Sequence, residues 1–126
     1  MKKIGRKIYI VGINSFKFED LSLEVQGLFH KIKNIAAPNT YINEIRDWVS
    51  IKLIKEKKFF PSKSNIELIQ WLKSVDDDAI LISRGDPLWY GIGRILLNNF
   101  SKEELLFYPG KTSIQLAFSR LKEPWQ

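Results

Sequence analysis

Short apolar runs alternate with amphipathic stretches along the whole chain. Five runs rich in β-branched or aromatic residues end at glycine, proline or polar positions, which predicts strands. These strands are expected at Lys7 to Val11, Asn34 to Ala37, Lys58 to Phe60, Ala79 to Ile82 and Leu105 to Tyr108. Gly12 is expected to end the first strand and Pro61 the third. The fourth run is apolar throughout, which is typical of a central strand covered on both faces.

The stretches between these runs carry apolar residues at helical spacing. Ser22 can cap a helix to about Lys33. Its apolar face is expected to hold Leu23, Leu28, Phe29 and Ile32. Further helices are predicted from about Tyr41 to Lys55, Ser64 to Ser74, Asp86 to Asn99, and Thr112 or Ser113 to Leu121. Capping boxes open the helix after Ser64 and a single turn after Ser101.

The alternation of strands and helices predicts the fold class. Parallel strands need crossover connections of about a dozen residues, and such crossovers are right-handed. The chain has 126 residues, which suits one domain. We therefore expect residues 1–126 to form a single α/β domain, a five-stranded parallel sheet with helices on both faces.

Composition argues against several kinds of site and membrane segment. The chain has no cysteine, so disulfides and thiolate metal sites are excluded, and its one histidine, His30, argues against a zinc site. The acidic run Asp76 to Asp78 is interpreted as a solvated turn, and no metal is expected. No apolar run approaches the roughly 20 residues of a membrane span, and the basic start precedes too short an apolar run for a signal peptide. We expect a soluble, cytoplasmic protein.

The formal net charge of +6 favours anionic partners. The charge is compatible with a solvated basic surface, with a polyanionic ligand, or with nucleic acid. A non-catalytic α/β domain that binds nucleic acid is therefore kept as an alternative, and it predicts binding that depends steeply on salt.

Three predicted loops mark the edge of the sheet where ligands bind. In an open parallel sheet this edge is formed by the carboxyl ends of the strands. The loops run from Gly12 to Phe16, from Ser83 to Leu88 and from Pro109 to Ser113. The second and third lead into helix N-termini, whose free N–H groups can hold a carboxylate, a phosphate or a ribose. The bland alternatives are that Gly12 only ends a strand and that Asp86 is only an N-cap.

One of these loops also spells the end of a phosphate-binding motif. Gly110-Lys111-Thr112 would need a glycine five residues before Gly110, and the chain has Leu105 there. An NTPase site is therefore not expected.

Two segments resemble the tetrapyrrole methylases. The first is similar to their GDP(L)(F)YGIG segment and reads Gly85-Asp86-Pro87-Leu88-Trp89-Tyr90-Gly91-Ile92-Gly93-Arg94. The second resembles a segment of one branch of the family and comprises Pro109 to Leu121, followed by Pro124-Trp125-Gln126. This branch is the cobalt-precorrin C5-methyltransferases of the cobalamin pathway, also known as the C5 portion of precorrin-6Y C5,15-methyltransferase. There it reads roughly PG-(I/V)-SS-x-QLAxARLxxPWQ. The strong similarity covers about 35 residues.

The resemblance implies an S-adenosylmethionine-dependent C-methyltransferase acting at C5 of a precorrin or cobalt-precorrin. It also implies a homodimer of two-domain subunits, with strand one between strands four and five. A partner domain or subunit for C15 methylation and decarboxylation is possible. A methylase of the same superfamily with another acceptor stays an alternative.

The family's contacts, carried over by position, define the candidate site. Contacts to the methyl donor fall on Arg84, Gly85, Asp86, Trp89, Thr112 and Ser113. Contacts to the tetrapyrrole fall on Gly12, Asn14, Ser15 and Lys111. No catalytic acid or base is named, because methyl transfer from a sulfonium mainly requires alignment. We expect this chain to be the N-terminal half of such an enzyme, with the second domain absent, and to be inactive alone.

The chain departs from the family at three places. The first loop has Asn14, Ser15 and Phe16 where the family has Gly-Pro-Gly. Arg84 replaces a small residue and Lys111 an apolar one, and both add positive charge near a site for a sulfonium cation. Such charges suit the site only if they point at substrate carboxylates.

Overall fold

The computed structural model of the protein describes residues 4–40, 42–48, 56–84 and 92–109, and its centre is a five-stranded sheet. The strands are β1 (Ile8–Ile13), β2 (Asn34–Pro38), β3 (Lys58–Ser62), β4 (Ala79–Arg84) and β5 (Leu105–Tyr108). Their order is β3-β2-β4-β1-β5, and all neighbours are parallel. The predicted parallel sheet is confirmed, and β1 lies between β4 and β5, as the resemblance implied.

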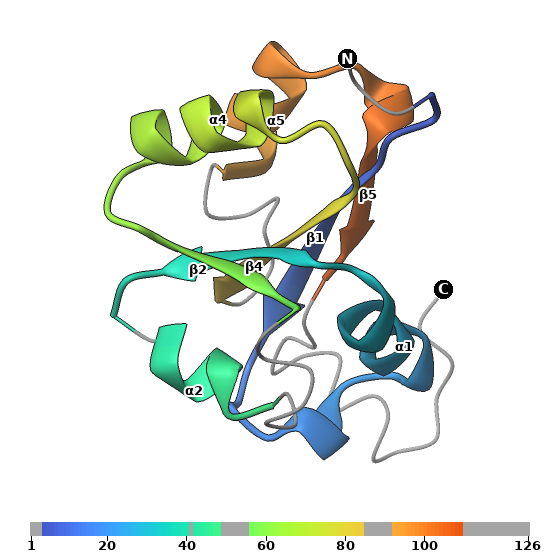
Figure 1. The fold of residues 1–126 in the computed structure, drawn as a ribbon, viewed down its shortest axis with the longest axis vertical. Coiled ribbons are helices and arrows are strands. Elements are labelled where there is room, and N and C mark those ends of the chain that lie inside the picture. The colour runs from blue at the N-terminus through green and yellow to red at the C-terminus, as the bar shows by residue number, and fades with distance from the viewer. Residues whose placement is uncertain (1–3, 41, 49–55, 85–91, 110–126) are drawn as a thin grey trace, which may run out of the picture.

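The helices form two layers, one on each face of the sheet (Figure 1). α1 (Leu23–Lys31) and α2 (Ile42–Arg46) cover one face, and α4 (Asn65–Ser74) and α5 (Ile92–Asn99) cover the other. The connections through α1 and α2 step toward the β3 edge of the sheet, whereas those through α4 and α5 step toward the β5 edge. Right-handed crossovers in opposite directions place their helices on opposite faces, which confirms the predicted helices on both faces.

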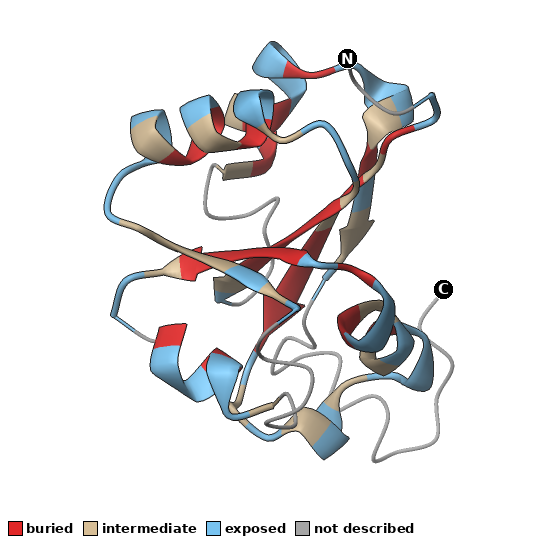
Figure 2. Cartoon of the chain, in the orientation of Figure 1, coloured by how far each residue is buried: buried red, intermediate tan, exposed pale blue. Residues whose placement is uncertain are grey.

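The core consists of two apolar clusters, separated by the sheet. Successive residues of a strand belong to opposite clusters, so that Ile80 and Ile82 face α1 and α2, whereas Leu81 faces α4 and α5. All of β4 from Ala79 to Ile82 is buried, as expected of a central strand. Figure 2 shows the buried strands in the middle and the exposed outer faces of the helices.

Helix α1 has the predicted cap, but a different apolar face. The Ser22 side chain accepts a hydrogen bond from the Val25 backbone N–H, at 3.2 Å. The expectation for Leu23 was wrong, because its side chain is 84% exposed and Val25 is buried in its place. At about 100° per residue, Val25, Phe29 and Ile32 share one face, and Leu23 lies well away from it. Phe29 and Ile32 are buried as predicted, and Leu28 packs half-buried against the same cluster.

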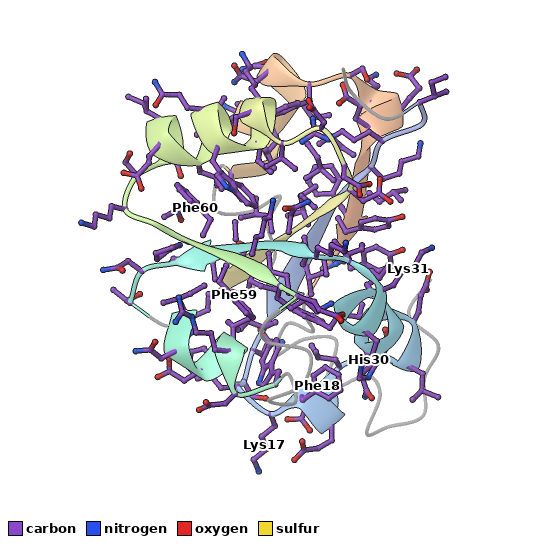
Figure 3. The ribbon with its side chains drawn as sticks, in the orientation of Figure 1. Lys17, Phe18, His30, Lys31, Phe59 and Phe60 are labelled. Atoms are coloured by element: carbon purple, nitrogen blue, oxygen red, sulfur yellow. The ribbon has the colours of Figure 1, made fainter. Side chains whose placement is uncertain are left out.

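Three strands continue past the residues that were expected to end them. β1 runs through Gly12 to Ile13, and β4 runs through Ser83 to Arg84, because the two strands stay paired to those ends. β3 continues through Pro61 to Ser62. β3 is an edge strand with only β2 beside it, so the missing N–H of a proline can be tolerated there. Figure 3 shows Phe59 of β3 directed toward α2, and Phe60 toward α4.

Helix α2 is shorter than predicted. It ends at Arg46, and the Trp48 N–H bonds the Ile45 carbonyl instead of continuing the α-helical pattern. The Trp48 indole packs at 5.3 Å from the Phe29 ring, which fixes the chain in this turn. The predicted continuation to Lys55 falls mostly on residues 49–55, outside the described residues.

The two predicted capping boxes differ in completeness. At the start of α4 one half of the box is formed, in which the Ser64 hydroxyl accepts from the Glu67 backbone N–H. At Ser101 both halves are formed, and Glu104 accepts from the backbone N–H of Ser101. The latter box opens the single turn η2 (Lys102–Glu104), as predicted. The predicted start of the helix at Asp86 and the last helix after Thr112 lie outside the described residues, although α5 reaches Asn99 as expected.

Candidate functional site

The candidate site lies where β1 and β4 end side by side. Gly12 is level with Ser83 and Ile13 with Arg84. After these residues the chain leaves β1 for α1 on one face and β4 for α5 on the other. Neighbouring strands whose connections go to opposite faces create a crevice at their carboxyl ends, which is the usual ligand position in open α/β sheets.

A first cavity, of about 550 Å³, opens on the α4 side of this edge. It lies over the ends of β1 to β4 and the start of α4, and its lining includes Leu81, Ser83 and Arg84 from β4. The other lining residues are Asn14, Pro38, Ser62, Asn65, Leu68, Ile82 and Ile92. Arg84 is the charged residue among them, and no carboxylate is, within the part of the chain that the structure describes.

A second cavity, of about 660 Å³, lies between the ends of β1 and β5 and the start of α1. Its charged lining residue is acidic, Asp20, and Tyr108 lies at its rim. The other lining residues are Val11, Gly12, Ile13, Asn14, Ser15, Leu21, Ser22, Val25, Phe107 and Pro109. Asn14 belongs to both cavities, so the loop after β1 separates them.

The structure brings four of the predicted site residues to this edge. Gly12 and Ser15 line the second cavity, Arg84 the first, and Asn14 both. Ser15 donates a hydrogen bond to Asp20, at 2.7 Å, which folds the loop after β1 back on itself. The other predicted contacts, Gly85, Asp86, Trp89, Lys111, Thr112 and Ser113, lie outside the described residues.

Arg84 packs against a second unusual residue of the candidate site. Its guanidinium carbon lies 5.7 Å from the centroid of the Phe16 ring, a cation–π arrangement. The Phe16 carbonyl accepts a hydrogen bond from the Trp48 indole N–H at 2.8 Å, so a residue of the turn after α2 anchors the loop after β1. Both Arg84 and Phe16 were identified from the sequence as departures from the family pattern, and the structure places them together.

Sequence reasoning missed the residues contributed by β2, β3 and the start of α4. Ser62 and Asn65 line the first cavity beside Pro38. The available signal was that strands two and three also end at the carboxyl edge, so their last residues belong to the same row of candidates. Tyr108 was missed for the same reason, as the end of β5.

Tyr108 at the rim of the second cavity forms a hydrogen bond with α1. Its hydroxyl donates to Glu24 at 3.1 Å, and its ring lies 6.3 Å from that of Tyr9. Burial raises the pKa of Tyr108 above its ordinary value of 10.0, and the hydrogen bond and negative charge of Glu24 raise it further. A raised phenol pKa favours the folded protein below about pH 10, and this contribution is lost as pH rises through the folded-state pKa.

We therefore expect a Glu24→Gln variant to lower the pKa of Tyr108 toward, but not to, its ordinary value. The remaining shift reflects burial, which is its largest cause. Absorbance titration measures the phenolate, and a Tyr108→Phe variant identifies which of the 4 tyrosines titrates. An unchanged Tyr108 pKa in Glu24→Gln would show that Glu24 has no part in the shift.

The residues that the structure describes contain neither a metal-binding cluster nor a membrane-spanning helix. No group of three or more histidine, cysteine, aspartate or glutamate side chains within these residues is arranged to hold a metal ion. Nor does any helix among them have the length and apolar character needed to cross a membrane.

Comparison with solved structures supports the fold. The chain superimposes on CobF of Corynebacterium diphtheriae, described as a cobalamin synthesis related protein, with a TM-score of 0.63 and 19% sequence identity. The superposition covers 96% of this chain and 60% of CobF. The TM-score is 0.59, at 16% identity, for the cobalamin biosynthesis precorrin-6Y methylase CbiE of Archaeoglobus fulgidus, covering 95% and 60% of the two chains.

Sequence comparisons returned nothing: neither a family model nor a curated protein matches. The structural likeness confirms the fold that the resemblance implied. The chain spans less than two thirds of each solved structure, 60% in both cases.

Proposed function

We propose that the protein is an S-adenosylmethionine-dependent methyltransferase that acts on a precorrin-type tetrapyrrole. The observation that carries this proposal is the fold shared with a precorrin-6Y methylase. Two further observations support it. The family-like segments follow β4 and β5 directly in the sequence, and two cavities open at the carboxyl edge of the sheet. Within the family, the Gln115 to Gln126 segment favours methylation at C5.

The proposed chemistry asks little of the side chains. S-adenosylmethionine supplies an activated methyl group when bound, so the protein has to align the acceptor carbon and exclude water. The described residues fit a small-molecule site, because Gly12 has no side chain where the second cavity meets β1 and Asn14 and Ser15 offer hydrogen-bonding groups. We propose that Arg84, Gly85, Asp86, Trp89, Thr112 and Ser113 surround the donor, and that Gly12, Asn14, Ser15 and Lys111 surround the acceptor.

We further propose that catalysis needs more than this domain. The chain covers 60% of each structural neighbour, and the proposed cleft lies at an edge of the sheet that a second domain would close. A homodimer of two-domain subunits, and a partner that performs C15 methylation and decarboxylation, follow from the same resemblance.

Calorimetry with S-adenosylmethionine and a methyl-transfer assay on a cobalt-precorrin test these proposals. We expect weak donor binding by the 126-residue chain and no turnover, because in this proposal a second domain completes the donor's surroundings. Adenosine triphosphate is a suitable control ligand, since it shares the adenosine and lacks the sulfonium.

Two outcomes would contradict the proposals separately. Turnover by these residues alone would remove the need for a second domain. Absence of donor binding, together with tight and salt-dependent binding to DNA or RNA, would favour the basic nucleic-acid-binding alternative.

A further inference from the structure

The first cavity carries a positive charge that no described residue neutralises. Arg84 is the last residue of β4, its side chain is exposed, and it lines the cavity beside Asn14 and Ser83. Within the described residues, no carboxylate forms a salt bridge with it and no carboxylate lines this cavity. A guanidinium presents its N–H donors in a planar fork that matches a carboxylate or a phosphate, and the acceptor of the proposed function carries carboxylates.

The position of this guanidinium is set by packing. It lies 5.7 Å from the centroid of the Phe16 ring, and the Phe16 carbonyl is held by the Trp48 indole at 2.8 Å. Trp48 is in turn packed edge-on against the buried Phe29 ring, at 5.3 Å between centroids. An arginine held in this way loses less conformational entropy when it binds a ligand than a free surface arginine does.

The two cavities differ in electrostatic character. The second is lined by Asp20, and its rim residue Tyr108 is bonded to Glu24. An anionic group is therefore favoured in the first cavity, beside Arg84, over the second.

We propose that the guanidinium of Arg84 determines specificity by binding a peripheral carboxylate of the acceptor, so that the donor contact proposed above for this residue is made by its backbone. Phe16 is the positioning residue that holds the guanidinium in the first cavity. This inference rests on the proposed function for the acceptor being a polycarboxylic tetrapyrrole. It adds to that function the residue and the cavity by which the carboxylate is recognised.

The test is the affinity of the full chain for uroporphyrin, an octacarboxylic porphyrin, measured by fluorescence quenching. We expect Arg84→Ala to weaken binding about tenfold, as the loss of one charge-assisted contact predicts. The affinity of Arg84→Lys should lie between those of the unmodified chain and Arg84→Ala, because lysine keeps the positive charge but lacks the planar fork of N–H donors. Phe16→Leu should weaken binding a few-fold, and much less in the Arg84→Ala background, because it acts through Arg84.

The chain offers a matched control in Arg46 at the end of α2. Its guanidinium carbon lies 5.4 Å from the centroid of the Phe59 ring, so Arg46→Ala removes the same charge and the same kind of aromatic contact. Arg46 lines neither cavity, so uroporphyrin affinity should change less than twofold. A porphyrin carrying only N-methylpyridinium cations should bind Arg84→Ala no worse than the unmodified chain, because it has no carboxylate to lose.

Equal losses in Arg84→Ala and Arg46→Ala would overturn the proposal in favour of a long-range charge effect. An unchanged affinity in Arg84→Ala, with a wild-type unfolding midpoint, would overturn it as well. S-adenosylmethionine binding separates this failure from that of the proposed function. If donor binding persists while Arg84 proves irrelevant to uroporphyrin, only this proposal fails; if the unmodified chain binds neither ligand, both fail.

Discussion

Replacing Phe29 with alanine is expected to destabilise the domain by about 3–5 kcal/mol, a large share of the roughly 5–15 kcal/mol that holds a small domain folded. The Phe29 side chain is 1% exposed and makes edge-on contacts with Phe18 and Trp48, at 6.1 and 5.3 Å between ring centroids. Alanine would leave a cavity between α1 and the sheet and remove both aromatic contacts. Urea unfolding followed by circular dichroism measures the loss.

Leu23 provides the matched control on the same helix. Its side chain is 84% exposed, so Leu23→Ala should change the free energy of unfolding by no more than about 0.5 kcal/mol. The pair tests whether α1 presents Phe29 or Leu23 to the sheet. A similar decrease in the free energy of unfolding for Phe29→Ala and Leu23→Ala would contradict the burial described for α1.

Replacing Arg6 with alanine is expected to cost about 2–4 kcal/mol, whereas Arg6→Met should cost less than half as much. Arg6 precedes β1 at the opposite end of the sheet from the cavities, and only 3% of it is exposed. Its Nη2 donates to the Leu72 carbonyl at 2.5 Å, and its Nη1 lies 3.6 Å from a carboxylate oxygen of Glu104. Phe100 lies under the guanidinium, at 5.8 Å from ring centroid to carbon.

The two Arg6 variants separate volume from charge. Burial lowers the pKa of Arg6, and the negative charge of Glu104 raises it by a smaller amount. Two of the side-chain nitrogens, Nε and Nη1, have no hydrogen-bond partner. The buried charge is therefore only partly compensated, and methionine removes its desolvation cost while keeping much of its packing. Thermal unfolding of both variants at neutral pH measures the difference. If Arg6→Met is as unstable as Arg6→Ala, the hydrogen bond to Leu72 and the pairing with Glu104 outweigh that cost.

The fold class could be predicted from the sequence because its signals are local. The apolar run from Ala79 to Ile82 has no polar residue to face water, so it reads as a central strand in any parallel sheet. Ser22, Ser64 and Ser101 mark helix starts through contacts within three residues along the chain. Such features depend on backbone geometry over one turn and need no knowledge of the neighbours.

The details that the sequence left undetermined depend on residues far apart in the chain. β3 continues through Pro61 because it is an edge strand, which only the order of strands reveals. Leu23 is exposed because the sheet meets the side of α1 that carries Val25. Helix α2 ends at Arg46, where the chain turns so that the Trp48 indole packs against the Phe29 ring. In each case a tertiary contact overrode a local preference.

The candidate site divides in the same way. The sequence alone predicted ligand-binding loops after β1 and β4, since glycine and polar residues follow apolar strands at Gly12 and Ser83. Only the tertiary structure decided that two cavities of opposite charge flank the loop at Asn14, and that Arg84 packs on Phe16. The physical reason is that a parallel sheet aligns the ends of strands that are about 70 residues apart in sequence, and no local pattern encodes which side chains then meet.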